Sequence, residues 1–193
     1  MGRPREFDIE KALDTASDLF WRNGYDRTSL TDLTTAIKIT PPSFYFAFGS
    51  KERLFKKVLG RYLTGHLGFV TEALSQPSAR AVAERLLNGL ADAYTDPDHP
   101  PGCLGLNCSL PCPDDTDPIR RTLARMREET QVQVCKRLKH AKASGDLPAD
   151  ANPDELARFL LVIGWGMAVD AQSGASRKQL RRMVATALKA WPT

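Results

Sequence analysis

No run of about 18 consecutive apolar residues occurs in this sequence, so we expect no membrane-spanning helix and no membrane partner. The opening residues, MGRPREFDIE, are charged and lack an apolar signal core, which argues against secretion. The Gly-x-Ser-x-Gly, phosphate-loop and HExxH motifs are missing, and His66, His99 and His140 show no obvious acid or nucleophile partner. We therefore expect a cytoplasmic protein that is not an enzyme and needs no cofactor.

Strong charge is also missing, because the formal net charge is only +4. A mild basic bias suits a DNA-binding protein whose second lobe is neutral, although many ordinary proteins share it. The 193 residues are enough for one substantial core, divided at most into two lobes.

Cysteine is scarce and unevenly placed. Cys103, Cys108 and Cys112 cluster, and Cys135 stands apart. In a reducing cytosol they would be free thiols rather than a disulfide framework. Two interpretations stay open: small buried hydrophobic residues, or a redox or soft-metal sensor with His99 nearby. The spacing matches no familiar Cys-x-x-Cys pair, so we assign no metal site.

Residues 29–48, SLTDLTTAIKITPPSFYFAF, predict two short helices joined by a tight turn. Thr40 is a good N-cap and Pro41 a good first helical residue, and the residue before a proline avoids the helical region. The first helix must therefore end by Ile39. The apolar faces consist of Leu30, Leu33 and Ile37 in the first helix and of Phe44 and Phe48 in the second. This is the pattern of a helix-turn-helix, which places its second helix in the DNA major groove.

The remaining chain is predicted to be almost entirely helical, because apolar residues recur every three or four positions. Between residues 96 and 118 lie six of the thirteen prolines, which leaves room only for one or two helical turns in CLGLNCSL. The expected helices cover residues 8–23, 51–74, 78–94, 118–143, 154–172 and 176–190. We predict an all-α fold with a three-helix helix-turn-helix domain at residues 1–49 and a larger helical bundle domain at residues 50–193.

The last two helices predict a dimer. The segment from Leu156 to Val169 is apolar almost all round yet too short to span a bilayer, so one side should face its own core and another side a partner chain. A four-helix contact between two copies satisfies this, and an ordinary internal bundle is the alternative. The predicted interface residues are Leu156, Phe159, Leu160, Ile163, Leu180, Met183, Val184, Ala187 and Leu188.

The segment GYDRTSLTDLTTAIKITPPSFYFAFGSKERLF resembles the TetR family of bacterial transcriptional regulators. The positions that carry the resemblance are Gly24-Tyr25, Thr28-Ser29, Asp32-Leu33, Ser43, Tyr45, Phe48 and Ser50-Lys51-Glu52. The C-terminal two-thirds are similar in helix layout only. The resemblance implies an N-terminal DNA-binding lobe, a C-terminal lobe with an effector pocket, a homodimer, and repression from a double-stranded DNA operator that a small molecule relieves.

Several side chains are candidates for contacts with DNA phosphates. Thr28 or Ser29, at the start of the second helix, can offer hydroxyl and amide donors. The phenol of Tyr45 points off the apolar stripe, and the family uses this tyrosine on phosphate; a partly exposed core tyrosine is the alternative. Lys51 is placed to meet the backbone or is simply a solvated charge. Arg3 is a candidate for the minor groove.

Base reading is expected to be modest. The start of the recognition helix, Thr40-Pro41-Pro42-Ser43, contains no Arg, Asn or Gln, which are the side chains that make bidentate contacts to purines. A threonine methyl and two proline rings can pack on thymine methyls, and Ser43 can bond to several bases. Part of the specificity is then expected to come from DNA shape.

Two positions depart from the family pattern. Lys38 replaces the turn glycine, so either the turn differs or a phosphate contact offsets a strain of up to about 1 kcal/mol. Phe46 replaces a histidine, which leaves an exposed aromatic ring or an extra thymine contact.

The effector pocket implied by the family lies among the middle helices. Each candidate residue has core packing as its alternative role. Gly164 and Gly166 either make room for a ligand or let helices approach. The pocket candidates are Leu63, Leu67, Leu86, Leu90, Cys103, Asn107, Met126, Thr130, Trp165 and Met167. A further alternative is a helical dimer that binds a ligand or a protein partner and has a degenerate DNA lobe.

Overall fold

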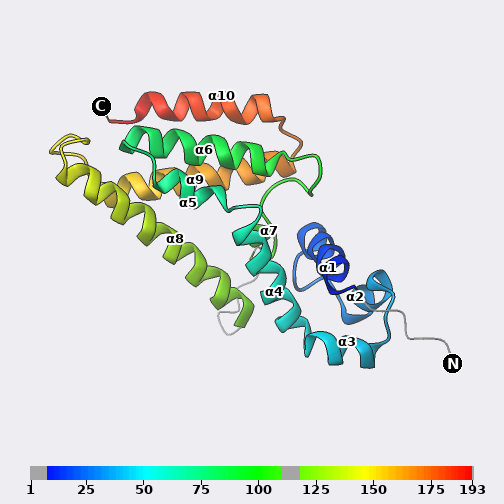
Figure 1. The fold of residues 1–193 in the computed structure, drawn as a ribbon. Helices are drawn as coiled ribbons and strands as arrows, with labels where there is room; N and C mark the ends of the chain where they lie inside the picture. Colours follow the sequence, from blue (N-terminus) through cyan, green and yellow to red (C-terminus); the bar gives the residue numbers. More distant parts are fainter. Residues whose placement is uncertain (1–7, 110–117, 193) are drawn as a thin grey trace.

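The computed structural model describes residues 8–109 and 118–192, and within these ranges the chain is helical and contains no strand. The predicted all-α fold is therefore confirmed (Figure 1). The helices are α1 (Ile9–Asn23), α2 (Leu30–Ile37), α3 (Pro41–Phe48), α4 (Lys51–Thr64), α5 (Phe69–Leu74), α6 (Ala79–Tyr94), α7 (Leu104–Asn107), α8 (Pro118–Ala143), α9 (Pro153–Gln172) and α10 (Arg177–Ala187), followed by the short 3₁₀ helix η1 (Leu188–Ala190). We call α1–α3 the head and α5–α10 the body; α4 runs between them.

The helix starts follow the capping signals of the sequence. Asp8 accepts a hydrogen bond from the Lys11 amide at 3.1 Å, and Ser50 accepts one from the Arg53 amide at 3.1 Å. Ser29 and Asp32 form a reciprocal capping box, as their spacing predicts. These local contacts satisfy amides that the first helical turn leaves without an intrahelical partner.

The predicted helix over residues 51–74 is wrong, because α4 ends at Thr64 and α5 begins at Phe69. A tight turn containing Gly65 and Gly68 separates them. A Cβ atom added to Gly68 would lie 2.5 Å from the Thr64 carbonyl oxygen, so this backbone approach requires glycine. The break places His66 in a connection instead of on a helix.

The head is held by a small aromatic core that α4 shares. Phe20, Leu33 and Phe44 are fully buried. Phe55 of α4 meets Phe20 edge-on, with ring centroids 5.1 Å apart. Since aromatic pairs of this kind add to the free energy of area burial, the first half of α4 is anchored to the head.

The body is a stack in which α6 packs against α5, α9 and α10, and α8 crosses beside α9 (Figure 1). The short helix α7 touches the head, where the Asn107 side-chain amide donates to the Trp21 carbonyl oxygen at 2.8 Å. The Asn107 side-chain oxygen in turn accepts a hydrogen bond from Gln172 at the end of α9. Along the part of the chain that the structure describes, no helix is both long enough and apolar enough to cross a bilayer.

The dimer prediction is corrected for α10. Leu180 and Val184 of this helix are buried within the single chain, where α10 packs against α6 and α9, so these two side chains leave no surface for a partner. The predicted interface residues that are buried inside the single chain are Leu160, Leu180, Val184, Ala187 and Leu188. The four others, Leu156, Phe159, Ile163 and Met183, are half-buried against the core.

A different stripe of α9 faces outward. Val162 and Val169 are 51% and 50% exposed, and Gly166 between them is exposed with open space beside it. Phe159 and Trp165 flank them and are partly exposed. We call these five residues the α9 stripe. An unpartnered apolar row of this kind is typical of a surface that another protein covers.

Candidate nucleic-acid interface and effector pocket

The helix α3 has a buried aromatic face and an exposed aromatic face. Phe44 and Phe48 are buried, whereas Tyr45 is 53% exposed and Phe46 is 96% exposed. The exposed positions on α3 and at its N-cap are Thr40, Pro41, Pro42, Ser43, Tyr45 and Phe46. All six predicted DNA-contact residues of this segment therefore lie on the outside of the head, at the end of the molecule away from α10 (Figure 1).

The hydroxyl groups at the start of α3 are engaged with each other. The Thr40 and Ser43 oxygens lie 3.0 Å apart, and the Ser43 amide donates to Thr40 at 3.4 Å. A base contact by Ser43 has to compete with this bond, which agrees with an expectation of modest direct readout.

The expectation that the Thr28 hydroxyl meets a phosphate is wrong. Thr28 is fully buried, and its hydroxyl donates to the Gly24 carbonyl oxygen at 2.7 Å. Ser29 is exposed, but its hydroxyl donates to the Asp32 carboxylate at 2.7 Å. This hydrogen bond lowers the pKa of Asp32, so the start of α2 already carries an anionic group that a phosphate must approach. Phosphate binding by Ser29 stays a prediction.

Lys38 adopts the left-handed backbone conformation, which favours glycine. Its φ and ψ are 63° and 45°, and among the described residues it is the one non-glycine with positive φ. The backbone of Lys38 is therefore strained in the folded protein. The turn carries the strain that the first alternative would have avoided, and the offset by a phosphate stays a prediction. Its side chain is exposed near the start of α3.

Replacing Lys38 by glycine is expected to raise the free energy of unfolding by about 1 kcal/mol, because glycine adopts this conformation without a Cβ clash. If Lys38 meets a phosphate, the same change weakens DNA binding and reduces the salt dependence. Thermal unfolding and gel shifts at two salt concentrations measure both effects. Lys136→Ala, on the exposed side of α8, is the charge control. Unchanged stability together with unchanged DNA affinity would contradict both assignments.

Lys51 and Arg3 complete the predicted phosphate contacts. The Lys51 ammonium lies 4.2 Å from the centroid of the Tyr25 ring and is half-buried. The interaction orients the ammonium at the start of α4, so Lys51 is not simply a solvated charge. Arg3 lies outside the described residues.

A cavity of about 290 Å³ opens in the body between α4, α6, α8 and α9. It is largely apolar, as a small-molecule site is expected to be. The predicted pocket residues that line it are Leu63, Leu67, Leu86, Leu90, Cys103, Met126, Thr130 and Trp165. Two predictions are wrong: Asn107 is directed to the Trp21 carbonyl, and Met167 is fully buried in the core.

The cavity also has polar lining that the sequence analysis missed. Tyr94 and Thr71 line it from the α6 and α5 sides, and Arg127, Glu129 and Gln133 line it from α8. Gln133 lies on the same helical face as Met126 and Thr130, so its position in the cavity could have been predicted from the spacing of these three residues. The polar groups give the cavity means to orient a ligand.

The two glycines of α9 have different roles. A Cβ atom on Gly164 would lie 2.8 Å from a methyl carbon of Leu90, so Gly164 lets α9 approach α6 at the cavity wall. Gly166 faces outward, with no atom within 4 Å of such a Cβ.

The described cysteines point in different directions. Cys103 lines the cavity and accepts a hydrogen bond from the Tyr62 hydroxyl at 3.3 Å. The Cys108 thiol donates to the Phe20 carbonyl oxygen at 3.4 Å, and burial raises the pKa of Cys108 to about 12. Cys112 lies outside the described residues. Cys108 is therefore a protonated, buried thiol at neutral pH, which is unsuited to a soft-metal or redox role.

Alkylation is expected to distinguish Cys108 from a reactive thiol. At pH 8 its thiolate fraction should be about three orders of magnitude below that of a free cysteine, because a pKa of about 12 compares with an ordinary value of about 8.5. Iodoacetamide should leave Cys108 unmodified in the native protein and modify it in urea, as peptide mass spectrometry measures. Rapid modification of the native protein would restore Cys108 as a sensor candidate.

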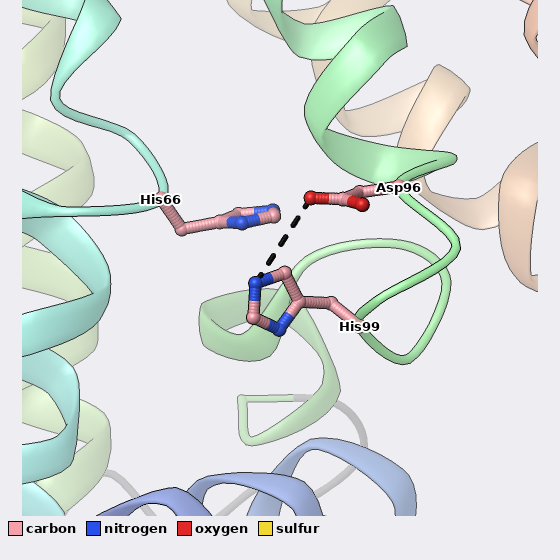
Figure 2. A group of neighbouring side chains, drawn as sticks. All are labelled: His66, Asp96 and His99. Atoms are coloured by element: carbon pink, nitrogen blue, oxygen red, sulfur yellow. Dashed lines mark ion pairs between the residues drawn. The ribbon is translucent and has the colours of Figure 1, made fainter.

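Two histidines that showed no obvious partner in the sequence, His66 and His99, meet Asp96 near the head. The His99 Nε2 atom lies 4.0 Å from an Asp96 carboxylate oxygen, and His66 points toward both (Figure 2). One ligand atom from each of the three lies within 4.8 Å of the others. Burial lowers the pKa of His66, which keeps its ring neutral. The expectation that His99 has no obvious acid partner is wrong, and the three-residue spacing of Asp96 and His99 was a signal for this pair.

Comparison with known proteins gives consistent matches. Residues 12–58 match the family described as "Bacterial regulatory proteins, tetR family", and residues 80–189 match "Tetracyclin repressor-like, C-terminal domain". The HTH-type transcriptional repressor ComR of Escherichia coli (strain K12) is 36% identical over 99% of this chain and 92% of its own length. The uncharacterized HTH-type transcriptional regulator YezE of Bacillus subtilis (strain 168) is 31% identical over 83% of this chain and 84% of its own length.

A solved structure is also similar throughout. It contains a cysteine-substituted variant of the TetR family transcriptional regulator CifR, complexed with 26-bp double-strand operator DNA. The identity is 39%, the TM-score is 0.90, and the match covers 98% of this chain and all of that one.

Proposed function

The chain belongs to the TetR family of bacterial transcriptional regulators, and from this premise we propose that it is a repressor that binds a double-stranded DNA operator as a homodimer and leaves it when a small molecule fills the body cavity. The observation that carries the proposal is the outer face of α3, where Phe46 is 96% exposed. Phe46 shares the short helix α3 with the exposed Pro41, Pro42 and Tyr45. An exposed apolar cluster of this kind suits a partner that covers it. Relatives named as repressors support the same role.

The head supplies two kinds of contact in this proposal. Tyr45, Lys38 and Lys51 hold phosphates and set the register of α3. Pro41, Pro42 and Phe46 pack on thymine methyls in the major groove, with Thr40 and Ser43 beside them. Because apolar contacts discriminate few bases, DNA shape supplies the remaining specificity.

The cavity sets the chemistry of the effector. About 290 Å³ lies at the lower end of small-molecule sites, which range from about 300 to 1,000 Å³. A small, mainly apolar compound fits, with one or two groups that bond to Tyr94, Thr130 or Gln133.

The path from cavity to DNA runs along α4. Leu63, in the last turn of α4, lines the cavity, and the first half of the same helix packs on the head. We keep the functional division at residues 1–49 for DNA binding and 50–193 for effector binding and dimerisation, with α4 as the link. A ligand that pushes on Leu63 moves the head, and this shift is what releases DNA.

The α9 stripe forms the centre of the dimer. Val162, Gly166 and Val169 lie on one side of the helix, so the same row on a second copy can pack against it about a two-fold axis. Two heads then read two half-sites of a palindrome.

Selection of bound sequences from random DNA, followed by gel shifts on the recovered palindrome, tests the proposal. We expect affinity to fall steeply as salt rises, since each neutralised phosphate releases condensed cations. Candidate effectors should then release the DNA. Failure to select any palindrome would favour the alternative in which the helical dimer binds another partner and its DNA lobe is degenerate.

A second candidate function is a DNA-binding regulator that responds to chemical modification of Cys103 and not to reversible binding of a small molecule. Cys103 faces the cavity and accepts a hydrogen bond from Tyr62, so an oxidant or an electrophile that enters the cavity can reach a polarised thiol. The Cys103→Ser variant should then bind DNA normally but no longer be released by oxidant. Unchanged release of the variant by oxidant, or release of the oxidised wild-type protein that a thiol reductant does not reverse, excludes Cys103 as a redox switch.

A further inference from the structure

We propose that His66, Asp96 and His99 form a binding site for a divalent transition-metal cation at the junction of head and body. The three side chains come from two connections, the turn between α4 and α5 and the loop after α6. Figure 2 shows the two rings and the carboxylate pointing toward one another across the gap between these connections. Their ligand atoms lie within 4.8 Å of one another.

The hydrogen bonding of His66 fits a metal ligand. Its Nε2 atom lies 2.9 Å from the Ala93 carbonyl oxygen. A carbonyl oxygen only accepts, so Nε2 carries the proton and Nδ1 keeps a free lone pair. Histidines that bind metals are held in this way, with the second ring nitrogen donating to a backbone carbonyl or a carboxylate.

The donor set selects the class of cation. Two imidazoles and one carboxylate suit zinc, cobalt or nickel, whereas calcium and magnesium prefer oxygen ligands alone. Bonds of about 2.0–2.2 Å require the three atoms to move closer together than in the metal-free protein. Both connections lie outside the helices, so this adjustment does not break helical hydrogen bonds.

The site is open on one side. His99 is exposed, whereas His66 and Asp96 are half-buried. A cation can enter past His99 and keep a water molecule or an external ligand as its fourth partner.

The ligands of the cation would contact the head as well as the body. The Trp21 ring of α1 stacks on His99, with ring centroids 5.7 Å apart and planes at 12°, and meets His66 edge-on at 5.0 Å. His66 also precedes Leu67, which lines the cavity. Occupation of the site would therefore fix the α4–α5 turn, the loop after α6 and α1 relative to one another, and this second input acts on the elements that join cavity to DNA.

Metal titration of the purified, chelator-treated full chain tests the proposal. We expect calorimetry to find one Zn²⁺ per chain, and the affinity to fall at least tenfold in His99→Gln and in Asp96→Asn. His140→Gln, which changes an exposed histidine of α8, should bind as the wild type does. Co²⁺ should give visible ligand-field bands without a thiolate charge-transfer band, and should quench tryptophan emission because Trp21 stacks on a ligand.

Three results would overturn the proposal: no saturable binding, equal affinity in both site variants and the wild type, or a cobalt–thiolate band that places the cation on cysteine. Thermal unfolding without metal shows whether each variant is folded. If His99→Gln is unfolded, the nearly isosteric Asp96→Asn decides the outcome alone, because it removes the anionic ligand with little change in shape.

Discussion

The substitution Val162→Glu is expected to turn the dimer into a monomer and to lower operator affinity by at least about a hundredfold. Val162 lies at the centre of the α9 stripe and is 51% exposed in the single chain. A two-fold interface repeats each change, so two carboxylates would be buried close together, at a cost of several kcal/mol. A monomer reads one half-site only and loses the second set of DNA contacts.

Sedimentation and gel shifts on the palindrome measure the two effects. Val132→Glu is the matched control, because Val132 is 60% exposed on α8 and is not part of the α9 stripe, and the same change there should alter neither property. If Val162→Glu remains a dimer with full DNA affinity, the interface lies on another surface.

The substitution Tyr45→Phe is expected to lower operator affinity by at least about a hundredfold in the dimer. A hydrogen bond to a charged acceptor contributes about 1.5–3 kcal/mol, and each half-site loses one. Tyr45 is 53% exposed, so removal of its hydroxyl should leave the stability of the head unchanged.

The salt dependence separates this contact from a lysine contact. A phenol donates to phosphate without neutralising it, so Tyr45→Phe should weaken binding equally at all salt concentrations. Lys51→Ala should instead reduce the slope of affinity against salt, by about 0.9 for each phosphate that the lysine neutralised. Wild-type affinity in Tyr45→Phe would place the phenol away from the DNA.

The helix-turn-helix was predictable from sequence because its signals are local. Each of the helices α2, α3 and α4 begins at an N-cap hydroxyl, which accepts a hydrogen bond from the backbone amide three residues later; the N-caps are Ser29, Thr40 and Ser50. Pro41 prevents the preceding helix from continuing. The conformation of Lys38 was left open, because the sequence does not show whether the turn before α3 keeps a positive φ when glycine is absent. The phosphate contact predicted for Thr28 was wrong because the sequence does not show whether a threonine hydroxyl bonds to a buried backbone carbonyl or faces solvent.

The errors arise where several segments meet. Periodicity showed that α10 has an apolar face but not which surface covers it, so Leu180 and Val184 were assigned to a partner when α6 covers them. The α4 stripe continued past Gly65 and Gly68, which hid the break. His66 lies about thirty residues from Asp96 and His99, and only the fold brings them together.

The amide of Asn107 has a consequence for operator geometry. It bonds to Trp21 of α1 on one side and to Gln172, the last residue of α9, on the other. The helix α9, which we propose as the subunit contact, is thereby connected to α1 of the head through the Asn107 side chain, by a route that does not pass through the body cavity. The separation of the two heads, and with it the number of base pairs between half-site centres, then depends on this bridge. Asn107→Ala should relax the preferred spacing of the palindrome while each half-site keeps its sequence.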